Sequence, residues 1–464
     1  MDVKNKKVTV VGIGRTSMAL IRLLLREGAM PYVTDASKAA ALQPMREQLE
    51  ELGVPYECGG HSSSAFEDTA LVIPSPGVPP SIEPIGQAVE AGAACISEME
   101  FAFPYCRSKI IAVTGTNGKT TTTELIRHMI YACGHTVLLA GNNDLPFSEA
   151  VMVEPAPEFI VLEVSSYQLE LIETFHPWIG VLLNLSEDHL ARHGTMEEYA
   201  SAKANLFAHQ GPGEIAIVNA DDPLCSGFAQ RRAGTCGLVL VPVHRFSVSQ
   251  RLETGLWLDG DTIRNGDTAI AERGDVHLPG PHNLENVLAA LAVMSIGDFR
   301  WDKVIEGLRC FEGVEHRLER VASIDGVDYI NDSKSTNLDS LKAALESFDG
   351  PLVLIAGGRG KGSDYASLRG PVAQRVSTLI TMGEDAPLIE DALAGEVPAL
   401  RAADMADAVA KAAQAAPAGG VVLLSPGCAS FDMYSNFEER GRDFKRAVGE
   451  LRPPRHGATE RMTA

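Results

Sequence analysis

The chain has 464 residues, too many for one ordinary domain, and this length predicts two to four. Its 45% hydrophobic and 22% charged residues are typical of a globular enzyme, and its net charge of −21 argues against a nucleic-acid partner. No apolar run reaches the ~20 residues of a membrane span, and the eight scattered cysteines form no C-x-x-C pair, so we expect a reduced, cytoplasmic protein without membrane insertion.

The N-terminal part reads as repeated strand–helix units. A strand at Lys7–Val11, a Gly12–Gly14 turn and a helix at Ser17–Glu27 resemble a dinucleotide-binding fingerprint, with Asp35 ending the next strand. Ser17 stands where such a fingerprint has its third glycine, so a plain α/β turn explains the pattern equally well. Further elements are a helix at Gln43–Leu52 and a strand at Ala70–Pro74.

A strand, a glycine turn and a helix at residues 110–134 predict a phosphate site. Ile110–Val113 has the β-branched composition of a buried strand, and a helical pattern follows Lys119 and Thr120. Backbone N–H groups at the start of a helix favour an anion, a lysine adds a point charge, and a hydroxyl can reach Mg²⁺. Val113 stands where the strict phosphate-loop pattern has glycine.

The segment Thr114–Thr120 resembles the nucleotide loop of the Mur ligases and the related folylpolyglutamate synthases. That family joins an amino acid to a carboxylate with hydrolysis of ATP. The resemblance implies that ATP contacts Gly115, Thr116, Asn117, Gly118, Lys119, Thr120 and Thr121. It also implies an N-terminal domain that holds the UDP of the substrate through Gly14, Arg15, Thr16, Asp35, Ser37, Ser75, Pro76 and Gly77.

Three later strand patterns end in polar residues. Phe159–Leu162 precedes Glu163, Ile179–Leu183 precedes the segment Asn184–His189, and Ile215–Val218 precedes Asn219. Ligands of parallel sheets bind beyond the carboxyl ends of strands, so Glu163 and His189 are expected to meet near the phosphates. Both residues match metal-binding positions of the family, and together with Thr120 this match implies a Mg²⁺ site. Asn142 matches a family asparagine near the substrate sugar.

Two helices carry further candidates. Asn283 and Asn286 share a helix face and can hold an adenine edge, although Asn283 is also suited to cap the helix N-terminus. Lys203 follows Tyr199 by about one turn; the residues alone suggest a surface lysine, whereas the resemblance implies a carbamate formed with carbon dioxide and bound to the metal. Between Arg231 and His277 we expect several antiparallel strands.

Beyond a linker at Glu312–Arg317, alternating helices and strands predict a third doubly wound domain. Polar segments follow three of its strands, at Asn331–Asn337, Gly357–Lys361 and Ser425–Ser430. The first and third resemble the glutamate-adding Mur ligases. The resemblance implies that Lys334, Thr336, Lys361, Ser430 and Phe437 hold glutamate and that Arg317 and Asp332 contact the nucleotide. The predicted elements are strands near Tyr329–Ile330 and at Leu352–Ala356, Thr378–Met382 and Val421–Leu424, with helices at Leu338–Phe348, Met405–Ala416 and Glu438–Val448.

We therefore predict an α/β chain of three domains: a Rossmann-like domain at 1–98, a phosphate-loop domain with additional antiparallel strands at 99–313, and a second Rossmann-like domain at 314–451, followed by a disordered tail at 452–464. The resemblance implies a monomeric cytoplasmic enzyme of peptidoglycan synthesis that uses ATP and Mg²⁺ to join D-glutamate to UDP-N-acetylmuramoyl-L-alanine. The alternatives are addition of L-glutamate or another amino acid, a folylpolyglutamate synthase, an NAD oxidoreductase, and a nucleotide-binding protein without catalysis.

Overall fold

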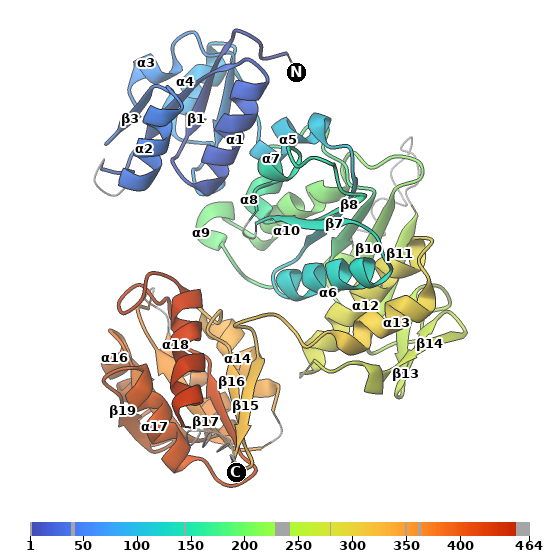
Figure 1. The fold of residues 1–464 in the computed structure, drawn as a ribbon, viewed down its shortest axis with the longest axis vertical. Helices are drawn as coiled ribbons and strands as arrows, with labels where there is room; N and C mark the ends of the chain where they lie inside the picture. The colour runs from blue at the N-terminus through green and yellow to red at the C-terminus, as the bar shows by residue number, and fades with distance from the viewer. Residues whose placement is uncertain are drawn as a thin grey trace, which may run out of the picture. The chain divides into compact units, whose positions relative to one another are not determined.

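The computed structural model describes residues 2–451 except 39–41, 143–144, 228–241, 279, 349, 361 and 363. The chain divides into two compact units, Met1–Val276 with Leu284–Phe311, and His277–Asn283 with Glu312–Ala464. The described residues form three sheets, two in the first unit and one in the second (Figure 1). The three-part α/β architecture is thus confirmed, while the limits at 98/99 and 313/314 remain predictions. Within the described ranges, no helix has the length and apolarity to cross a bilayer.

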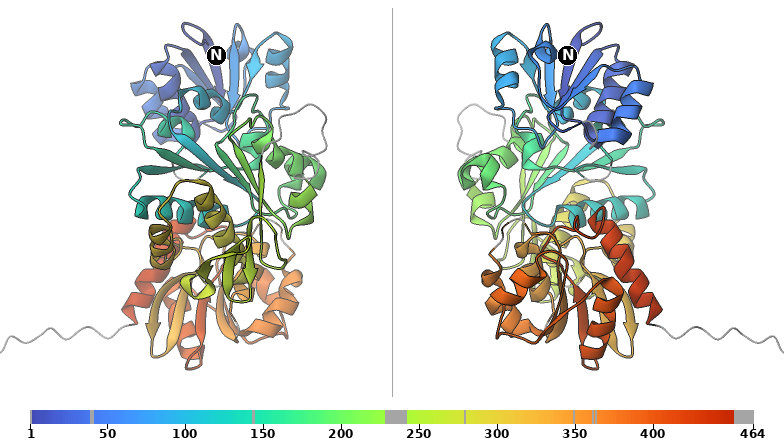
Figure 2. Two further views of the ribbon diagram at one scale, coloured as in Figure 1. Left: turned by 90° about the vertical axis from the view of Figure 1, so that its right-hand side faces the viewer. Right: turned by 90° about the vertical axis from the view of Figure 1, so that its left-hand side faces the viewer.

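The N-terminal sheet is fully parallel and has the order β3-β2-β1-β4-β5. Along β1, Val8 and Val10 face one apolar core with Leu20 and Leu24, whereas Val11 faces another with Phe66. Helices therefore cover both faces, as Figure 2 shows. The elements are β1 (Lys7–Val11), α1 (Arg15–Arg26), β2 (Met30–Asp35), α2 (Gln43–Glu51), β3 (Tyr56–Cys58), α3 (Ser63–Phe66), β4 (Leu71–Pro74), α4 (Glu83–Glu90), β5 (Ala94–Cys95) and α5 (Glu98–Ala102).

The central sheet has the order β14-β13-β12-β11-β10-β9-β6-β8-β7. The strands from β7 to β12 run parallel, and only β12, β13 and β14 pair antiparallel. Its elements are β6 (Lys109–Thr114), α6 (Lys119–Ala132), β7 (Val137–Gly141), α7 (Phe147–Ala150), β8 (Phe159–Glu163), α8 (Ser166–Leu169), β9 (Ile179–Leu182), α9 (Leu190–His193), α10 (Met196–Ala204), β10 (Ile215–Asn219), β11 (Val243–Ser247), β12 (Leu256–Asp259), β13 (Thr262–Asn265), β14 (Thr268–Glu272), α12 (Pro281–Ile296) and α13 (Trp301–Cys310).

The C-terminal sheet has the order β15-β16-β20-β17-β18-β19, with only β15 and β16 antiparallel. Leu352 and Leu354 of β17 face the core that contains Leu341 and Val372, and Val353 and Ile355 face the core that contains Phe444. The elements are β15 (Glu319–Ile324), β16 (Val327–Asn331), α14 (Leu338–Glu346), β17 (Leu352–Gly357), α15 (Arg369–Arg375), β18 (Val376–Met382), α16 (Ala386–Ala392), β19 (Ala399–Arg401), α17 (Met405–Ala415), β20 (Val421–Leu424) and α18 (Phe437–Glu450).

Three local expectations need correction. Helix α1 begins at Arg15, because Ser17 closes its first turn by accepting a hydrogen bond from the Gly14 N–H. Helix α12 begins at Pro281, so Asn283 lies within the first turn and does not cap it. The several antiparallel strands expected between Arg231 and His277 are present as β12, β13 and β14, but β11 in the same segment joins the parallel part of the sheet. The predicted disordered tail, 452–464, lies outside the described residues.

Candidate active site

The phosphate loop leaves β6, an inner strand of its sheet between β8 and β9, and enters α6. Gly118 precedes the helix with φ +84°, and a Cβ there would lie 2.1 Å from Oδ1 of Asn286, so only glycine fits. The Nζ of Lys119 donates to the carbonyl oxygens of Gly115 and Thr116 at 2.9 and 2.8 Å. The lysine ammonium is thus held over the glycine turn, where a phosphate would meet it.

Glu163 brings two other predicted site residues together. It ends β8 directly beside Val113 of β6 and is buried. One carboxylate oxygen accepts from Oγ1 of Thr120 at 2.7 Å, and the other accepts from Nδ2 of Asn142 at 3.0 Å. A hydroxyl and a carboxylate this close are oxygen ligands of the kind that Mg²⁺ prefers, so the residues present fit that ion.

Lys203 is a buried lysine, not the surface residue that its sequence context alone suggested. Its side chain is 2% exposed, and Nζ donates to the carbonyl oxygen of Gly115 at 2.9 Å, the same oxygen that Lys119 contacts. Burial, together with the positive charge of Lys119, lowers the pKa of Lys203 to about 6. The amine is therefore largely uncharged at neutral pH and carries a nucleophilic lone pair.

His189 lies in a segment that is tied to the phosphate loop. The N–H of Asn117 donates to Oδ1 of Asn184 at 2.8 Å, and the N–H of Ser186 donates to Oγ1 of Thr116 at 3.0 Å. His189 itself is exposed, has φ +55°, and contacts the Tyr167 ring at 5.0 Å between centroids. The structure thus brings the segment that carries His189 against the phosphate loop.

Tyr199 contacts this site and was missed from the sequence, as was Arg192, which lies on the neighbouring helix α9. The hydroxyl of Tyr199 lies 3.1 Å from Oγ1 of Thr116, and Nζ of Lys203 lies 4.7 Å from the centre of its ring. Arg192 pairs with Glu170 at 2.7 Å and donates to the carbonyl oxygen of Val78 at 3.3 Å. The four-residue spacing of Tyr199 and Lys203 on one helix face was the available signal, whereas nothing local marked Arg192.

The expected UDP-binding residues gather where the strand order reverses in the N-terminal sheet, between β1 and β4. Oxygen atoms of Asp35 accept from the N–H groups of Ile13 and Ser37, both at 2.6 Å. Burial alone would raise the pKa of Asp35, but these bonds lower it. Ser75 follows β4 and donates to the carbonyl oxygen of Gly12 at 3.3 Å. Two turns and a carboxylate therefore meet at one edge of this sheet. Of the other expected contacts, Gly14, Ser37, Pro76 and Gly77 lie in the segments after these strands, and Arg15 and Thr16 begin helix α1.

The three polar segments of the C-terminal sheet also meet, because β16, β20 and β17 are neighbours. The N–H of Gly427 donates to the carbonyl oxygen of Ser335, and Arg359 and Ala429 exchange backbone bonds. Ser430 is buried in this group. The half-buried Thr336 lies in the segment after β16, and Lys361 lies outside the described residues.

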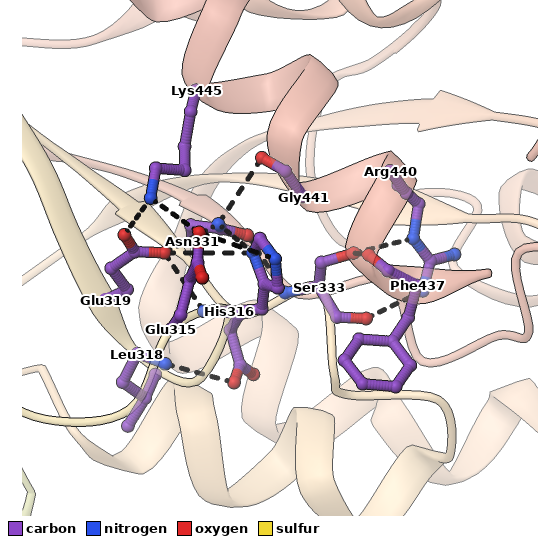
Figure 3. A network of polar contacts seen from close by, with 11 residues as sticks. Glu315, His316, Leu318, Glu319, Asn331, Ser333, Phe437, Arg440, Gly441 and Lys445 are labelled. Carbon is purple, nitrogen blue, oxygen red and sulfur yellow. Dashed lines mark hydrogen bonds and ion pairs between the residues drawn. The ribbon is translucent and has the colours of Figure 1, made fainter. Parts of the chain in front are cut away.

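Helix α18 connects these segments. Nε and Nη2 of the buried Arg440 donate to Oγ and O of Ser333 at 3.0 and 2.8 Å (Figure 3). Its Nη1 donates to the carbonyl oxygen of Cys428 at 3.1 Å. Nζ of Lys334 lies 5.7 Å from the centre of the Phe437 ring. Two expected glutamate contacts, Lys334 and Phe437, are thus close together.

Asp332 is buried beside these segments. It accepts from the Leu318 N–H at 3.2 Å and from Oγ of Ser425 at 2.9 Å. Burial raises the pKa of Asp332 to about 7, although the nearby Arg317 guanidinium acts in the opposite direction. Asp332 and Arg317, both expected to contact the nucleotide, therefore form one electrostatic pair.

Comparisons with known proteins extend over almost the whole chain. The Mur ligase MurD-like N-terminal domain matches residues 6–97, the Mur ligase middle domain 113–294, and the Mur ligase glutamate ligase domain 316–428. The UDP-N-acetylmuramoylalanine–D-glutamate ligase of Pelotomaculum thermopropionicum is 44% identical over 457 residues, which cover 97% of this chain and 99% of the relative. The chain belongs to the Mur ligase family. The Salinibacter ruber ligase of the same name is 41% identical with the same coverage.

Solved Mur ligase structures share this fold. The UDP-N-acetylmuramate-alanine ligase MurC of Thermotoga maritima has a TM-score of 0.60 at 18% identity and covers 97% of this chain and 100% of its own. A pseudomurein peptide ligase type C from Methanothermus fervidus has a TM-score of 0.58 at 17% identity with the same coverage. At this identity the likeness establishes the three-sheet Mur ligase architecture and no residue's role.

Proposed function

We propose that this Mur ligase uses ATP to join D-glutamate to UDP-N-acetylmuramoyl-L-alanine, a cytoplasmic step of peptidoglycan synthesis. The observation that carries the proposal is the phosphate loop with Lys119 over its turn and Thr120 bonded to the buried Glu163, in a chain 44% identical to a ligase so named. The edge of the N-terminal sheet between β1 and β4 is the proposed place for UDP, through the residues already assigned to it. We propose a monomer.

A carboxylate does not react directly with an amine, because hydroxide is a poor leaving group, so the carboxylate must first be activated. The substrate carboxylate attacks the γ-phosphorus of ATP, which releases ADP and leaves an acyl phosphate. The amine of glutamate then attacks the acyl carbon, and inorganic phosphate leaves with the bonding electrons. In the first step, Lys119 stabilises negative charge on the phosphoryl oxygens. In the second, the C-terminal segments hold the glutamate amine near the acyl carbon, which is a proximity effect.

We assign Mg²⁺ to Thr120 and Glu163, with His189 and a carbamate on Lys203 as further ligands. Bound there, the ion would neutralise phosphoryl charge. The carbamate forms when the neutral amine of Lys203 attacks carbon dioxide, with an N–C bond made and a proton lost. Two observations support the assignment: burial keeps the amine of Lys203 neutral and therefore nucleophilic, and the adjacent ammonium of Lys119 favours an anionic side chain over a second cation.

The remaining roles follow the family positions. Asn283 and Asn286 would hold the adenine, Arg317 and Asp332 would contact the nucleotide, and Asn142 would hold the substrate sugar. Lys334, Thr336, Lys361, Ser430 and Phe437 would hold glutamate.

Phosphate release tests the proposal. The purified chain is assayed with Mg²⁺, ATP and UDP-N-acetylmuramoyl-L-alanine, and with D-glutamate, L-glutamate or neither. We expect release only when both the UDP-sugar and D-glutamate are present. Release with L-glutamate but not with D-glutamate would reverse the assigned enantiomer. In a further mixture, a reduced folate replaces the UDP-sugar, and release only there would identify a folylpolyglutamate synthase. Absence of release in every mixture would contradict a ligase.

A further inference from the structure

The turn that carries Arg317 is strained on both sides. His316 has φ +64° and Leu318 has φ +45°, in a region that non-glycine residues seldom occupy. Such a backbone costs on the order of 1–3 kcal/mol per residue unless its surroundings hold it. The Leu318 N–H is held by Asp332, and the His316 N–H donates to Oε2 of Glu319 at 3.0 Å. The direction of Arg317 therefore depends on contacts made by its two neighbours.

His316 also contacts the segment proposed to bind glutamate. Nδ2 of Asn331 lies 2.9 Å from its Nδ1 and 2.9 Å from Oε2 of Glu319, so one amide holds both side chains (Figure 3). The N–H of Lys334 donates to the carbonyl oxygen of His316 at 3.0 Å. One residue thus connects the Arg317 turn to the segment Asn331–Thr336.

Helix α18 closes the pocket around this imidazole. A Cβ on Gly441 would lie 2.3 Å from Nδ1 of His316, which is closer than real side chains approach. The Phe437 ring, one turn earlier, meets the imidazole edge-on with 6.3 Å between centroids. His316 is 3% exposed as a result. The absence of a side chain at position 441 is what makes room for the imidazole.

A metal does not account for the cluster. Glu315, His316 and Glu319 lie close enough to share an ion. However, Nζ of Lys445 lies 3.0 Å from Glu315 and also pairs with Glu319 (Figure 3). The ammonium already supplies the cation that these carboxylates require.

We propose that His316 is a positioning residue of the ligase: its imidazole, seated between Asn331 and Gly441, holds the strained turn of Arg317 and the glutamate-binding segment in one arrangement. The inference rests on the proposed function, because Arg317, Lys334 and Thr336 receive their roles there. His316 itself contacts no substrate in this account. Loss of the His316 side chain should weaken the binding of both ATP and glutamate. Binding of the UDP-sugar should not change, because the residues proposed to bind it belong to the other compact unit.

Glycine substitutions on one helix provide the test. Gly441→Ala places a methyl group against the imidazole, whereas Gly449→Ala lies in the same helix with nothing within 4 Å. Both changes raise helix propensity by about 1 kcal/mol, so they differ mainly in the contact with His316. We expect Gly441→Ala to raise the KM for ATP and for glutamate about tenfold, with KM for the UDP-sugar unchanged, and Gly449→Ala to behave as the parent.

His316→Asn keeps the test decisive if Gly441→Ala folds poorly, because asparagine tolerates the left-handed backbone. It should show the same KM pattern, and adding Gly441→Ala to it should cause little further loss, since the clashing ring is gone. Unchanged KM values for ATP and glutamate in both single variants would overturn the positioning role, as would an equal rise in all three KM values with a lower Tm. An inactive parent would instead overturn the proposed function, and this role with it.

Discussion

Replacing Lys203 by methionine should stabilise the protein while abolishing its activity. Methionine has a similar length and fills a buried apolar space without a charge. Lys203 has a native pKa of about 6 against an ordinary value of 10.5, so at pH 7 folding must remove its proton. At 1.36 kcal/mol per unit over the 3.5 units between 7 and 10.5, this costs about 5 kcal/mol. Lys203→Met avoids this cost but also loses the hydrogen bond to Gly115, which contributes about 1–2 kcal/mol. The net stabilisation is therefore about 3 kcal/mol.

The sign of the pH dependence follows from the same shift. Between about pH 6 and 10.5 the unfolded chain binds more protons at Lys203 than the native chain does. The contribution of Lys203 to the free energy of unfolding therefore rises with pH across this window in the parent. Lys203→Met should lack that rise.

Urea unfolding in carbon dioxide-free buffer at pH 7 and pH 9 measures both effects. Added bicarbonate should then raise the Tm of the parent, because a carbamate removes the cost of the buried amine, and intact-mass analysis should show one added carbon dioxide. Lys203→Met should not respond. A destabilised Lys203→Met, or an equal bicarbonate response in both proteins, would refute the reasoning.

Three further outcomes are expected. Lys119→Ala should lower kcat at least about 100-fold with little change in Tm, since its contacts are with loop carbonyls; retained turnover would remove Lys119 from the phosphate site. The full chain should bind UDP but not NADH in a titration, with UDP affinity unchanged in Lys119→Ala, because Ser17 replaces the third glycine of a dinucleotide turn; NADH binding without UDP binding would favour an oxidoreductase. Lys361→Ala should raise the KM for glutamate about tenfold and leave that for ATP unchanged, because an ammonium suits the glutamate carboxylate; the opposite split would move Lys361 to the nucleotide.

Strand ends were the most predictable feature of the site. Thr120 and Glu163 are 43 residues apart, yet parallel pairing of β6 with β8 places their side chains 2.7 Å apart. The same rule gathers the segments after β16, β17 and β20. A buried parallel strand has a strong apolar signature, and its carboxyl end fixes where the next polar residue lies.

Features that depend on distant packing were not predictable. Helix α13 was also missed, although its buried residues Val304, Gly307 and Leu308 share one face and offered a periodic signal. The parallel direction of β11 cannot be read from its own residues. From the sequence, His316 was interpreted as part of a linker. Its left-handed backbone is accompanied by contacts with Asn331 and Glu319, and the local sequence does not reveal these contacts. The hydrogen bond of Arg192 to Val78 joins residues that are 114 positions apart, so no local pattern predicts it.

Transfer of labelled oxygen tests the acyl phosphate most directly. UDP-N-acetylmuramoyl-L-alanine with oxygen-18 in its alanyl carboxylate is incubated with Mg²⁺, ATP and D-glutamate, and the released phosphate is analysed by mass spectrometry. The account predicts that each phosphate released carries one oxygen from the substrate carboxylate, because the acyl C–O bond breaks when glutamate attacks. Amide product accompanied by unlabelled phosphate would contradict it.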